Sequence, residues 1–209
     1  MSRTEDFEIK RNEILDCAEQ LFMMRGYELT TVNAILKKVG IAKGTFYYYF
    51  TSKEEVMDAV IMRIVWKESD YAKQILTNEE MTPIEKLVAS LFRKPKSNAK
   101  KTIVERLSQA NNALMKQRAL QRTLEIVCPI YAEIVNEGNI KKEFSSSNPL
   151  CDIQFLIAGI QTLYDLSSVD NSSIEVGLDA VLNAMFQVLK MDETKISKEQ
   201  VKGMIVQNM

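Results

Sequence analysis

The spacing of apolar residues near the N-terminus is that of two consecutive helices. A first apolar face recurs every three or four residues and consists of Ile14, Ala18, Leu21 and Phe22. Gly26 provides a stop for this helix. Thr30 and Thr31 then offer hydroxyl N-caps for a second apolar stripe, which Gly40 ends. The stripe consists of Val32, Ile35, Leu36 and Val39.

Helix-start signals continue beyond residue 50. The segment Ser52-Lys-Glu-Glu55 has the form of a capping box and predicts a long helix that runs to about residue 76. The segment Thr82-Pro-Ile-Glu85 combines an N-cap, a proline at the first helical position and a glutamate, and predicts a short helix that ends before Pro95.

The C-terminal half of the chain is also predicted to be helical. The helical pattern resumes near Lys101 and runs to Gly138, and Pro129 is expected to kink or break it. Further helices are predicted at about 149–168, at about 173–190 after a capping box at Ser172–Glu175, and from Ser197 onward. We find no convincing strand and no internal repeat, so an all-α fold is predicted.

Five consecutive aromatic residues, Phe46 to Phe50, follow directly after Lys43, Gly44 and Thr45. This stretch has β-propensity, but its short length and the helices on either side favour a helix. On a helix, Phe46, Tyr49 and Phe50 share one side and can pack on the preceding helix. The residues of the opposite side are Lys43, Gly44, Tyr47 and Tyr48.

Residues 31–50 therefore have the order helix, tight turn, helix, as in DNA-binding proteins that insert the second helix into the major groove. Lys43 can reach a guanine edge or a phosphate, and Thr45 can contact a thymine methyl group. Gly44 allows a close approach of the backbone. A helical hairpin that merely carries surface tyrosines fits the spacing as well.

Other side chains near these helices suit the DNA backbone. The hydroxyl groups of Tyr47 and Tyr48 can donate to phosphate oxygens. Thr31 and Lys53 stand at helix starts, where free backbone amides favour phosphates.

Composition and length indicate an ordinary folded protein. The chain has 209 residues, of which 46% are hydrophobic and 26% charged, enough for one large domain or two small ones. No apolar run approaches the roughly 18 residues that a membrane span needs. The charged N-terminus lacks the apolar core of a signal peptide, so we expect a cytoplasmic protein that does not associate with membranes.

Charge is distributed unevenly although the whole chain carries only −1. Residues 1–24 hold three basic and six acidic side chains, 3 − 6 = −3, whereas residues 25–53 hold five basic and one acidic, 5 − 1 = +4. A local basic patch is the feature that matters for phosphate binding. A second basic run, at 93–101, contains proline and serine and is interpreted as a solvated loop.

The chemistry of the chain disfavours an enzyme. It contains no histidine, which removes histidine-based nucleophile activation and histidine-based zinc sites. Its three cysteines, at 17, 128 and 151, are widely spaced and are interpreted as small core residues. We expect no catalytic residues, no metal and no cofactor.

Residues 11–56 resemble the DNA-binding domain of the TetR family of bacterial transcriptional regulators. The matching features are Phe-x-x-x-Gly-Tyr at 22–27, Thr-Thr-Val at 30–32, the segment from Gly40 to Phe50, and Ser-Lys-Glu-Glu at 52–55. Departures from the family pattern are Asn33, Leu36, Lys37 and Ala42. Asn33 lacks the cation and Ala42 lacks the hydroxyl group that the family pattern often has there. The predicted DNA-binding residues are Thr31, Asn33, Ala42, Lys43, Gly44, Thr45, Tyr47, Tyr48 and Lys53.

The resemblance implies a homodimer that binds a palindromic operator in double-stranded DNA and acts as a repressor. It implies a DNA-binding domain at 1–51 and a C-terminal domain at 52–209 for effector binding and dimerisation. The helices at about 149–168 and 173–190 would form a four-helix bundle across the two-fold axis. Their apolar faces, which could equally be monomer core, are Phe155, Ala158, Gly159, Thr162 and Leu166 on one helix, and Leu178, Val181, Leu182, Met185 and Leu189 on the other.

The resemblance also implies a pocket for a small-molecule effector in the C-terminal domain. The candidate lining residues are Trp66, Phe92, Met115, Tyr131, Phe155, Gln161 and Tyr164. Glu133 and Asp165 are candidates for a cationic effector, although surface carboxylates are commoner, and the eleven methionines are interpreted as core filling. A regulator without a small-molecule effector and a helical protein-interaction module are the alternatives.

Overall fold

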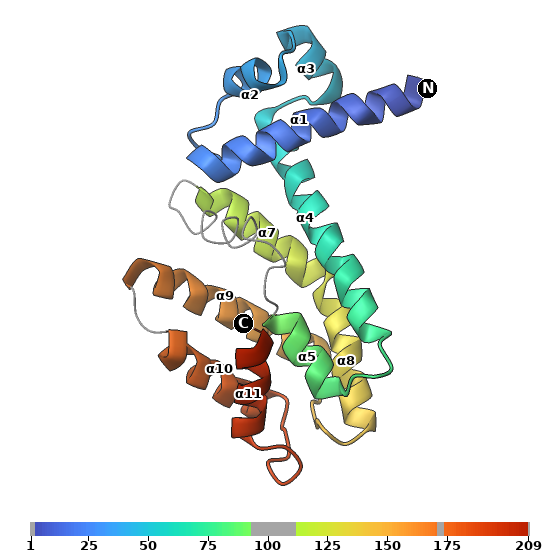
Figure 1. Cartoon of the computed structure of the whole chain (residues 1–209), viewed down its shortest axis with the longest axis vertical. Helices are drawn as coiled ribbons and strands as arrows, with labels where there is room; N and C mark the ends of the chain where they lie inside the picture. Colours follow the sequence, from blue (N-terminus) through green and yellow to red (C-terminus); the bar gives the residue numbers. More distant parts are fainter. Residues whose placement is uncertain (1–2, 93–111, 171–173, 209) are drawn as a thin grey trace. The chain divides into compact units, whose positions relative to one another are not determined.

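The computed structural model describes residues 3–92, 112–170 and 174–208, and within these ranges every regular element is an α-helix. This confirms the all-α prediction (Figure 1). None of the described helices is both long and apolar enough to cross a membrane. The helices are α1 (Arg3–Arg25), α2 (Val32–Val39), α3 (Lys43–Tyr49), α4 (Lys53–Leu76), α5 (Pro83–Leu91), α7 (Ala113–Ile126), α8 (Cys128–Ile140), α9 (Pro149–Asp170), α10 (Ile174–Val188) and α11 (Lys198–Asn208).

The chain forms two compact units. The first contains Met1–Ile64 and Ser97–Ala119, and the second contains Val65–Lys96 and Leu120–Met209. Helices α4 and α7 therefore each contribute residues to both units. The boundary predicted after residue 51 separates a DNA-binding domain from an effector-binding domain, which is a division by function and not by compact units. It stays a prediction.

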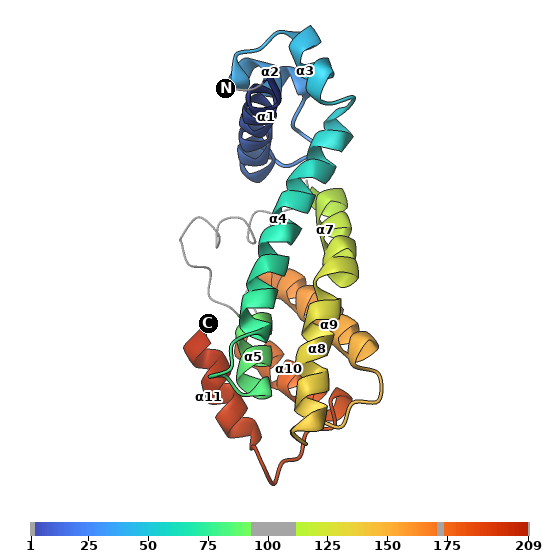
Figure 2. The same ribbon diagram turned by 90° about the vertical axis from the view of Figure 1, so that its right-hand side faces the viewer.

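The first unit is built on α1, α2 and α3, with α2 and α3 beside α1 in both views (Figures 1 and 2). The aromatic and aliphatic side chains predicted to face inward from these helices form its core. Those exposed by 1% or less are Ile14, Ala18, Phe22, Ile35, Phe46 and Phe50. Burial of this apolar surface, at about 25 cal/mol per Å², is the main force that holds the short helices in place.

Two glycines and two threonines set the turns around α2. Gly26 (φ 87°) and Gly40 (φ 77°) adopt the left-handed conformation that ends a helix. Thr31 is the N-cap of α2, and its hydroxyl accepts a hydrogen bond from the Ala34 amide at 3.1 Å. Thr30, the other predicted cap, is fully buried instead and donates to the Gly26 carbonyl at 2.7 Å.

The beginning of α7 belongs to the first unit. The Asn112 side-chain oxygen is buried and accepts the Tyr27 amide at 2.7 Å, so it satisfies a donor in the turn between α1 and α2. Arg118 donates to Asp58 at 2.7 Å and also to Glu54, both on the first half of α4. These polar contacts connect residues about 60 to 85 positions apart in the sequence.

The start of α4 differs in one detail from the predicted capping box. The Ser52 hydroxyl accepts the Glu55 amide at 3.1 Å, as predicted. The Glu55 carboxylate, however, accepts both the amide and the hydroxyl of Thr51, each at 2.6 Å, rather than the Ser52 amide. The prediction of reciprocal bonds between Ser52 and Glu55 was therefore wrong, because Thr51 offers two donors one residue earlier.

In the second unit, the predicted start of α5 is confirmed. Thr82 and Glu85 form a reciprocal capping box with Pro83 in the first turn. Within α5, Lys86 is only 3% exposed; its ammonium group donates to Glu137 of α8 at 2.7 Å and to the Leu76 carbonyl at 2.9 Å. A buried lysine requires such partners, so this side chain connects α5 to α8 and to the end of α4.

In the second unit, α10 packs against α9, and α11 packs against α5 and α10, while α8 contacts both α5 and α9 (Figure 2).

As predicted, the helical segment is broken near Pro129: α7 ends at Ile126 and α8 begins at Cys128. Ser197 and Gln200 form reciprocal bonds at the start of α11, at 2.8 and 3.2 Å. The predicted helix start near Lys101 and the predicted capping residues at 172–173 lie outside the described residues.

The two apolar faces predicted for the four-helix bundle differ in exposure. All five residues predicted on the second face, four on α10 and Leu189 directly after it, are buried within the chain itself, with Met185 and Leu189 completely so. These five side chains are therefore part of the core of the chain itself, and the four-helix bundle stays a prediction. On α9, in contrast, Phe155 is 63% exposed, and Gly159 and Thr162 are exposed as well. The side chain of Leu166 lies outside the described part of the structure.

Candidate nucleic-acid interface

A three-residue turn positions α3 against α2. The Gly40 amide donates to the Leu36 carbonyl at 2.9 Å, and the Ile41 amide donates to the same carbonyl at 3.2 Å. Ala42, with an extended backbone, is the N-cap of α3 and contributes no side-chain hydrogen bond. The amides of the first turn of α3 are therefore not capped by the Ala42 side chain and can donate to an external acceptor.

The inner side of α3 is confirmed in part. Phe46 and Phe50 are exposed by 0% and 1%, with ring centroids 6.1 Å apart. Tyr49, the third residue predicted on this side, is only half-buried, and its ring lies 4.7 Å from that of Phe7 on α1. Tyr49 therefore lies at the edge of the core, against α1.

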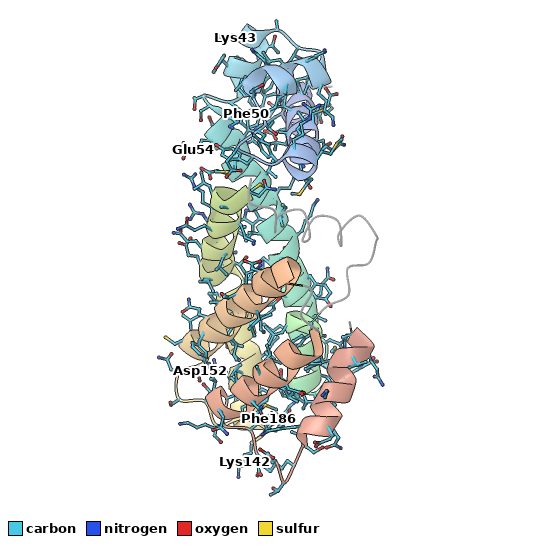
Figure 3. The ribbon with its side chains drawn as sticks, turned by 90° about the vertical axis from the view of Figure 1, so that its left-hand side faces the viewer. Lys43, Phe50, Glu54, Lys142, Asp152 and Phe186 are labelled. Atoms are coloured by element: carbon cyan, nitrogen blue, oxygen red, sulfur yellow. The ribbon has the colours of Figure 1, made fainter. Side chains whose placement is uncertain are left out.

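The outer side of α3 carries the side chains predicted to face DNA. Tyr47 is 46% exposed and Tyr48 is 65% exposed. Lys43, Gly44 and Thr45 are exposed as well. The Lys43 ammonium lies 5.9 Å from the centre of the Tyr47 ring, a distance that permits a cation–π contact. Figure 3 labels Lys43 at the edge of the first unit and Phe50 among its packed side chains.

The N-terminus of α2 provides a second group of polar side chains. Thr31 and Asn33 are exposed there, and Thr31 uses its hydroxyl oxygen as a helix cap. The last turn of α2 carries Lys37 and Lys38, which are also exposed. Their charges contribute to a positive potential around α2 and α3, which attracts a polyanion.

Lys53 has an internal partner that the sequence did not reveal. Its ammonium donates to the Tyr27 carbonyl at 2.8 Å and lies 4.1 Å from the centre of the Tyr27 ring. Burial lowers the pKa of Lys53 below its usual value, and the nearby Glu28 carboxylate acts in the opposite direction. A phosphate contact by Lys53 therefore competes with the contact to Tyr27.

Phe7 is the residue near this face that the sequence interpretation missed. It is half-buried, and its ring contacts both Tyr48 and Tyr49. The available signal was its position seven residues before Ile14, which places both residues on one side of α1.

The candidate effector-binding residues are dispersed. Phe92 and Tyr131 are buried in the second unit, whereas Trp66 and Phe155 are 50% and 63% exposed. Gln161 is half-buried and donates to Asp165 at 3.0 Å. Met115 is fully buried in the first unit, and Glu133 is exposed on α8. Tyr164 lies on α9, and its side chain is outside the described part of the structure. The effector pocket stays a prediction.

The cysteines occupy three different environments. Cys128 is buried, and burial raises the pKa of its thiol to about 12, so the thiol stays protonated. Cys17 is half-buried and Cys151 is exposed, and all three are free thiols. The interpretation as core residues therefore holds for Cys128 and was wrong for Cys151.

Comparison with known proteins identifies relatives of the chain. A family model described as "Bacterial regulatory proteins, tetR family" matches residues 14–60. The "Uncharacterized HTH-type transcriptional regulator in lacX 3'region" of Lactococcus lactis subsp. lactis is 32% identical over 144 residues, which are 51% of this chain and 72% of that protein. The "HTH-type transcriptional repressor KstR2" of Rhodococcus jostii is 42% identical over 52 residues, 25% of this chain and 26% of that protein.

Solved structures share the whole fold. The crystal structure of RolR in complex with resorcinol superimposes with a TM-score of 0.66, covering 95% of this chain and 96% of that one. The sequence identity of the pair is 17%, so this similarity establishes the fold alone.

Proposed function

Because the chain belongs to the TetR family of bacterial regulatory proteins, we propose that it is a dimeric repressor that binds a palindromic operator and is released by a small-molecule effector. The family consists of transcriptional regulators, not enzymes. Regulators of this kind bind DNA and act as dimers with small-molecule ligands.

The observation that carries the DNA-binding proposal is the division of α3 into two faces. Its phenylalanines are buried, while Lys43 and two tyrosines point outward on one exposed strip with Gly44 and Thr45. Two tyrosine rings exposed beside a lysine make no contribution to the core of the unit. They suit a DNA duplex, because tyrosine hydroxyls bind phosphate oxygens and a lysine binds either a phosphate or a guanine edge.

The proposal is tested by Lys43→Ala and Tyr47→Ala, measured on an operator selected from random duplexes. Each contact contributes about 1–3 kcal/mol, so we expect binding to weaken by roughly 5- to 150-fold. If Lys43 contacts the DNA backbone, loss of the lysine should also make the slope of log affinity against log salt concentration less steep, by the contribution of about one phosphate contact. Lys67→Ala, at an exposed position of α4 in the second unit, is the control. Normal operator binding by both α3 variants would refute the assigned face.

Gly44 permits a test that is independent of charge. Among the described residues, a Cβ added at Gly44 meets no atom beyond its chain neighbours and its own helix backbone within 4 Å, so Gly44→Ala should fold normally. If the backbone of α3 approaches DNA closely at this residue, the added methyl group will clash with the duplex and weaken binding at least tenfold. Gly203→Ala is the matched control, because its Cβ also has open space and it lies on α11 in the second unit. Equal operator affinity for both variants would place Gly44 away from the DNA.

We propose that two chains associate through α9. The exposed strip on this helix combines Phe155, which is 63% exposed, with the small residue Gly159 one turn later. An apolar side chain beside small residues lets two helices approach closely, and burial of Phe155 removes it from water. A two-fold dimer would present two α3 helices to operator half-sites about 34–36 Å apart.

An effector would act because it binds the released conformation more tightly than the DNA-binding conformation, and this difference in affinity shifts the equilibrium between them. In support of such a site, RolR binds resorcinol and has the same fold. The second unit also contains a polar atom suited to a ligand: the Ser90 hydroxyl on α5 is buried and has no hydrogen-bond partner among the residues that the structure describes. Buried polar groups are normally paired, so an effector that hydrogen-bonds there would complete the site.

The effector proposal is tested with a panel of small aromatic molecules that includes resorcinol. A member of the panel should raise the melting temperature and release operator DNA at the same concentrations. Ser90→Ala should reduce that response while leaving operator affinity in the absence of the compound unchanged. A compound that releases DNA equally well from Ser90→Ala binds elsewhere. Failure of every compound would favour control without a small molecule.

A further inference from the structure

Phe7 connects the N-terminal turns of α1 to the outward face of α3. The residue lies seven positions before residue 14, where the match to the family model begins. We propose that Phe7 is a positioning residue for DNA recognition, whose ring holds Tyr48 in the orientation that contacts the operator. This inference rests on the proposed DNA-binding function of α3.

Three rings form a cluster at this point. The Phe7 centroid lies 5.6 Å from that of Tyr48 at an interplanar angle of 75°, and 4.7 Å from that of Tyr49 at 36°. Tyr48 and Tyr49 are themselves 5.0 Å apart at 87°. The edge-to-face arrangement is the favourable geometry for aromatic pairs. Tyr48 therefore has aromatic neighbours from two helices although it is 65% exposed.

The neighbouring turn of α1 is attached to the same aromatic run. The Arg11 guanidinium lies 5.0 Å from the centre of the Phe50 ring. Phe7 and Arg11 are one helical turn apart and face α3 together. The N-terminal turns of α1 are therefore a packed part of the first unit, and Phe7 has a defined position from which to support Tyr48.

Such support matters because α3 is short. The helix has seven residues and its N-cap makes no side-chain hydrogen bond, so few local interactions restrict its exposed side chains. Immobilising one side chain on binding costs about 0.5–1.5 kcal/mol. A ring already held against Phe7 avoids much of this cost, and its hydroxyl is delivered at a fixed place relative to Lys43.

The test is a double-mutant cycle with Phe7→Ala and Tyr48→Ala, measured as operator affinity of the full chain. We expect Phe7→Ala to weaken binding about three- to tenfold in the presence of Tyr48. In a Tyr48→Ala background the same change should alter binding less than twofold, because the ring it positions is gone. Circular dichroism and thermal melts confirm that each variant is folded under the binding conditions.

Conservative replacements distinguish a ring that positions Tyr48 from a side chain that only fills apolar space. Phe7→Tyr retains the ring and should bind like the wild type, whereas Phe7→Leu retains apolar bulk without a ring and should bind like Phe7→Ala. Ile9→Ala, at a 47% exposed position of the same helix, is the control and should bind normally. Normal binding by Phe7→Leu, or equal effects of Phe7→Ala in both backgrounds, would overturn the inference. If Tyr48→Ala alone binds normally, the error lies in the face assigned to α3.

Discussion

At the scale of single residues, Gly138 shows how one missing side chain determines local packing. It lies on α8, and the ring of Phe144, which is 1% exposed, lies directly against it. A Cβ added at Gly138 would overlap the edge of the Phe144 ring and lie 3.0 Å from the carbon that attaches the ring. The whole ring would have to move, because the contact involves its attachment carbon as well as its edge.

Gly138→Ala should therefore destabilise the protein. Overpacking of a filled core costs about 1–3 kcal/mol, which exceeds the gain of up to about 1 kcal/mol from replacing a helical glycine. Chemical denaturation measures the change. Gly203→Ala, where the new Cβ meets no neighbouring element of the described structure within 4 Å, should be neutral or stabilising. Equal stability of both variants would show that Phe144 can relocate without cost.

At the scale of elements, the start of α4 depends on one carboxylate. Glu55 accepts the hydroxyl and the amide of Thr51, and these hydrogen bonds lower the pKa of Glu55 below its ordinary value of 4.5. Because the folded state holds the ionised form, the contribution of Glu55 to stability is present above the unfolded pKa. It is lost as the pH falls through the lower pKa of the folded state.

Glu55→Gln should consequently reduce stability at neutral pH by about 0.5–1 kcal/mol, the net value of a hydrogen bond. The difference between wild type and variant should shrink as the pH falls below 4.5, the ordinary value for Glu55. Denaturation series between pH 7 and pH 3 provide the measurement. Glu199→Gln, in the first turn of α11, removes an exposed carboxylate in a similar position and is the control. A difference independent of pH would mean that the charge of Glu55 has no part in the cap.

At the scale of the whole molecule, α9 and α10 of the second unit differ in how far their apolar faces are covered. The apolar face of α10 is buried within the chain, whereas Phe155 on α9 is exposed to solvent. A repressor that reads two half-sites needs a second copy, and the exposed face of α9 is the surface we propose for it.

Phe155→Glu should convert the proposed dimer into a monomer, because two like charges and their hydration would oppose contact across the two-fold axis. Light scattering coupled to size-exclusion chromatography measures the mass. Operator binding should fall at the same time, since a monomer contacts only one half-site. Gln74→Glu, an exposed change on α4, controls for the added charge. A variant that remains a dimer would place the interface elsewhere.

Much of the candidate site was predictable because it depends on local rules. The helical period alone places Phe46 inside and Lys43 with Tyr47 and Tyr48 outside, provided that residues 43–49 are a helix. The turn before this helix follows from Gly40, whose positive φ is tolerated by few other residues. The Thr82 cap was predictable for the same reason, since its partners lie within three residues.

The sequence by itself thus determined the helices, most of their caps and the outward face of α3, because interactions between near neighbours in the chain decide these features. Only the tertiary structure decided which apolar faces are covered, because periodicity identifies such a face without revealing what packs on it. It also decided that Lys53 contacts Tyr27 and that Phe7 contacts Tyr48. These contacts join residues 26 and about 40 positions apart, and only the tertiary packing of the first unit brings them together.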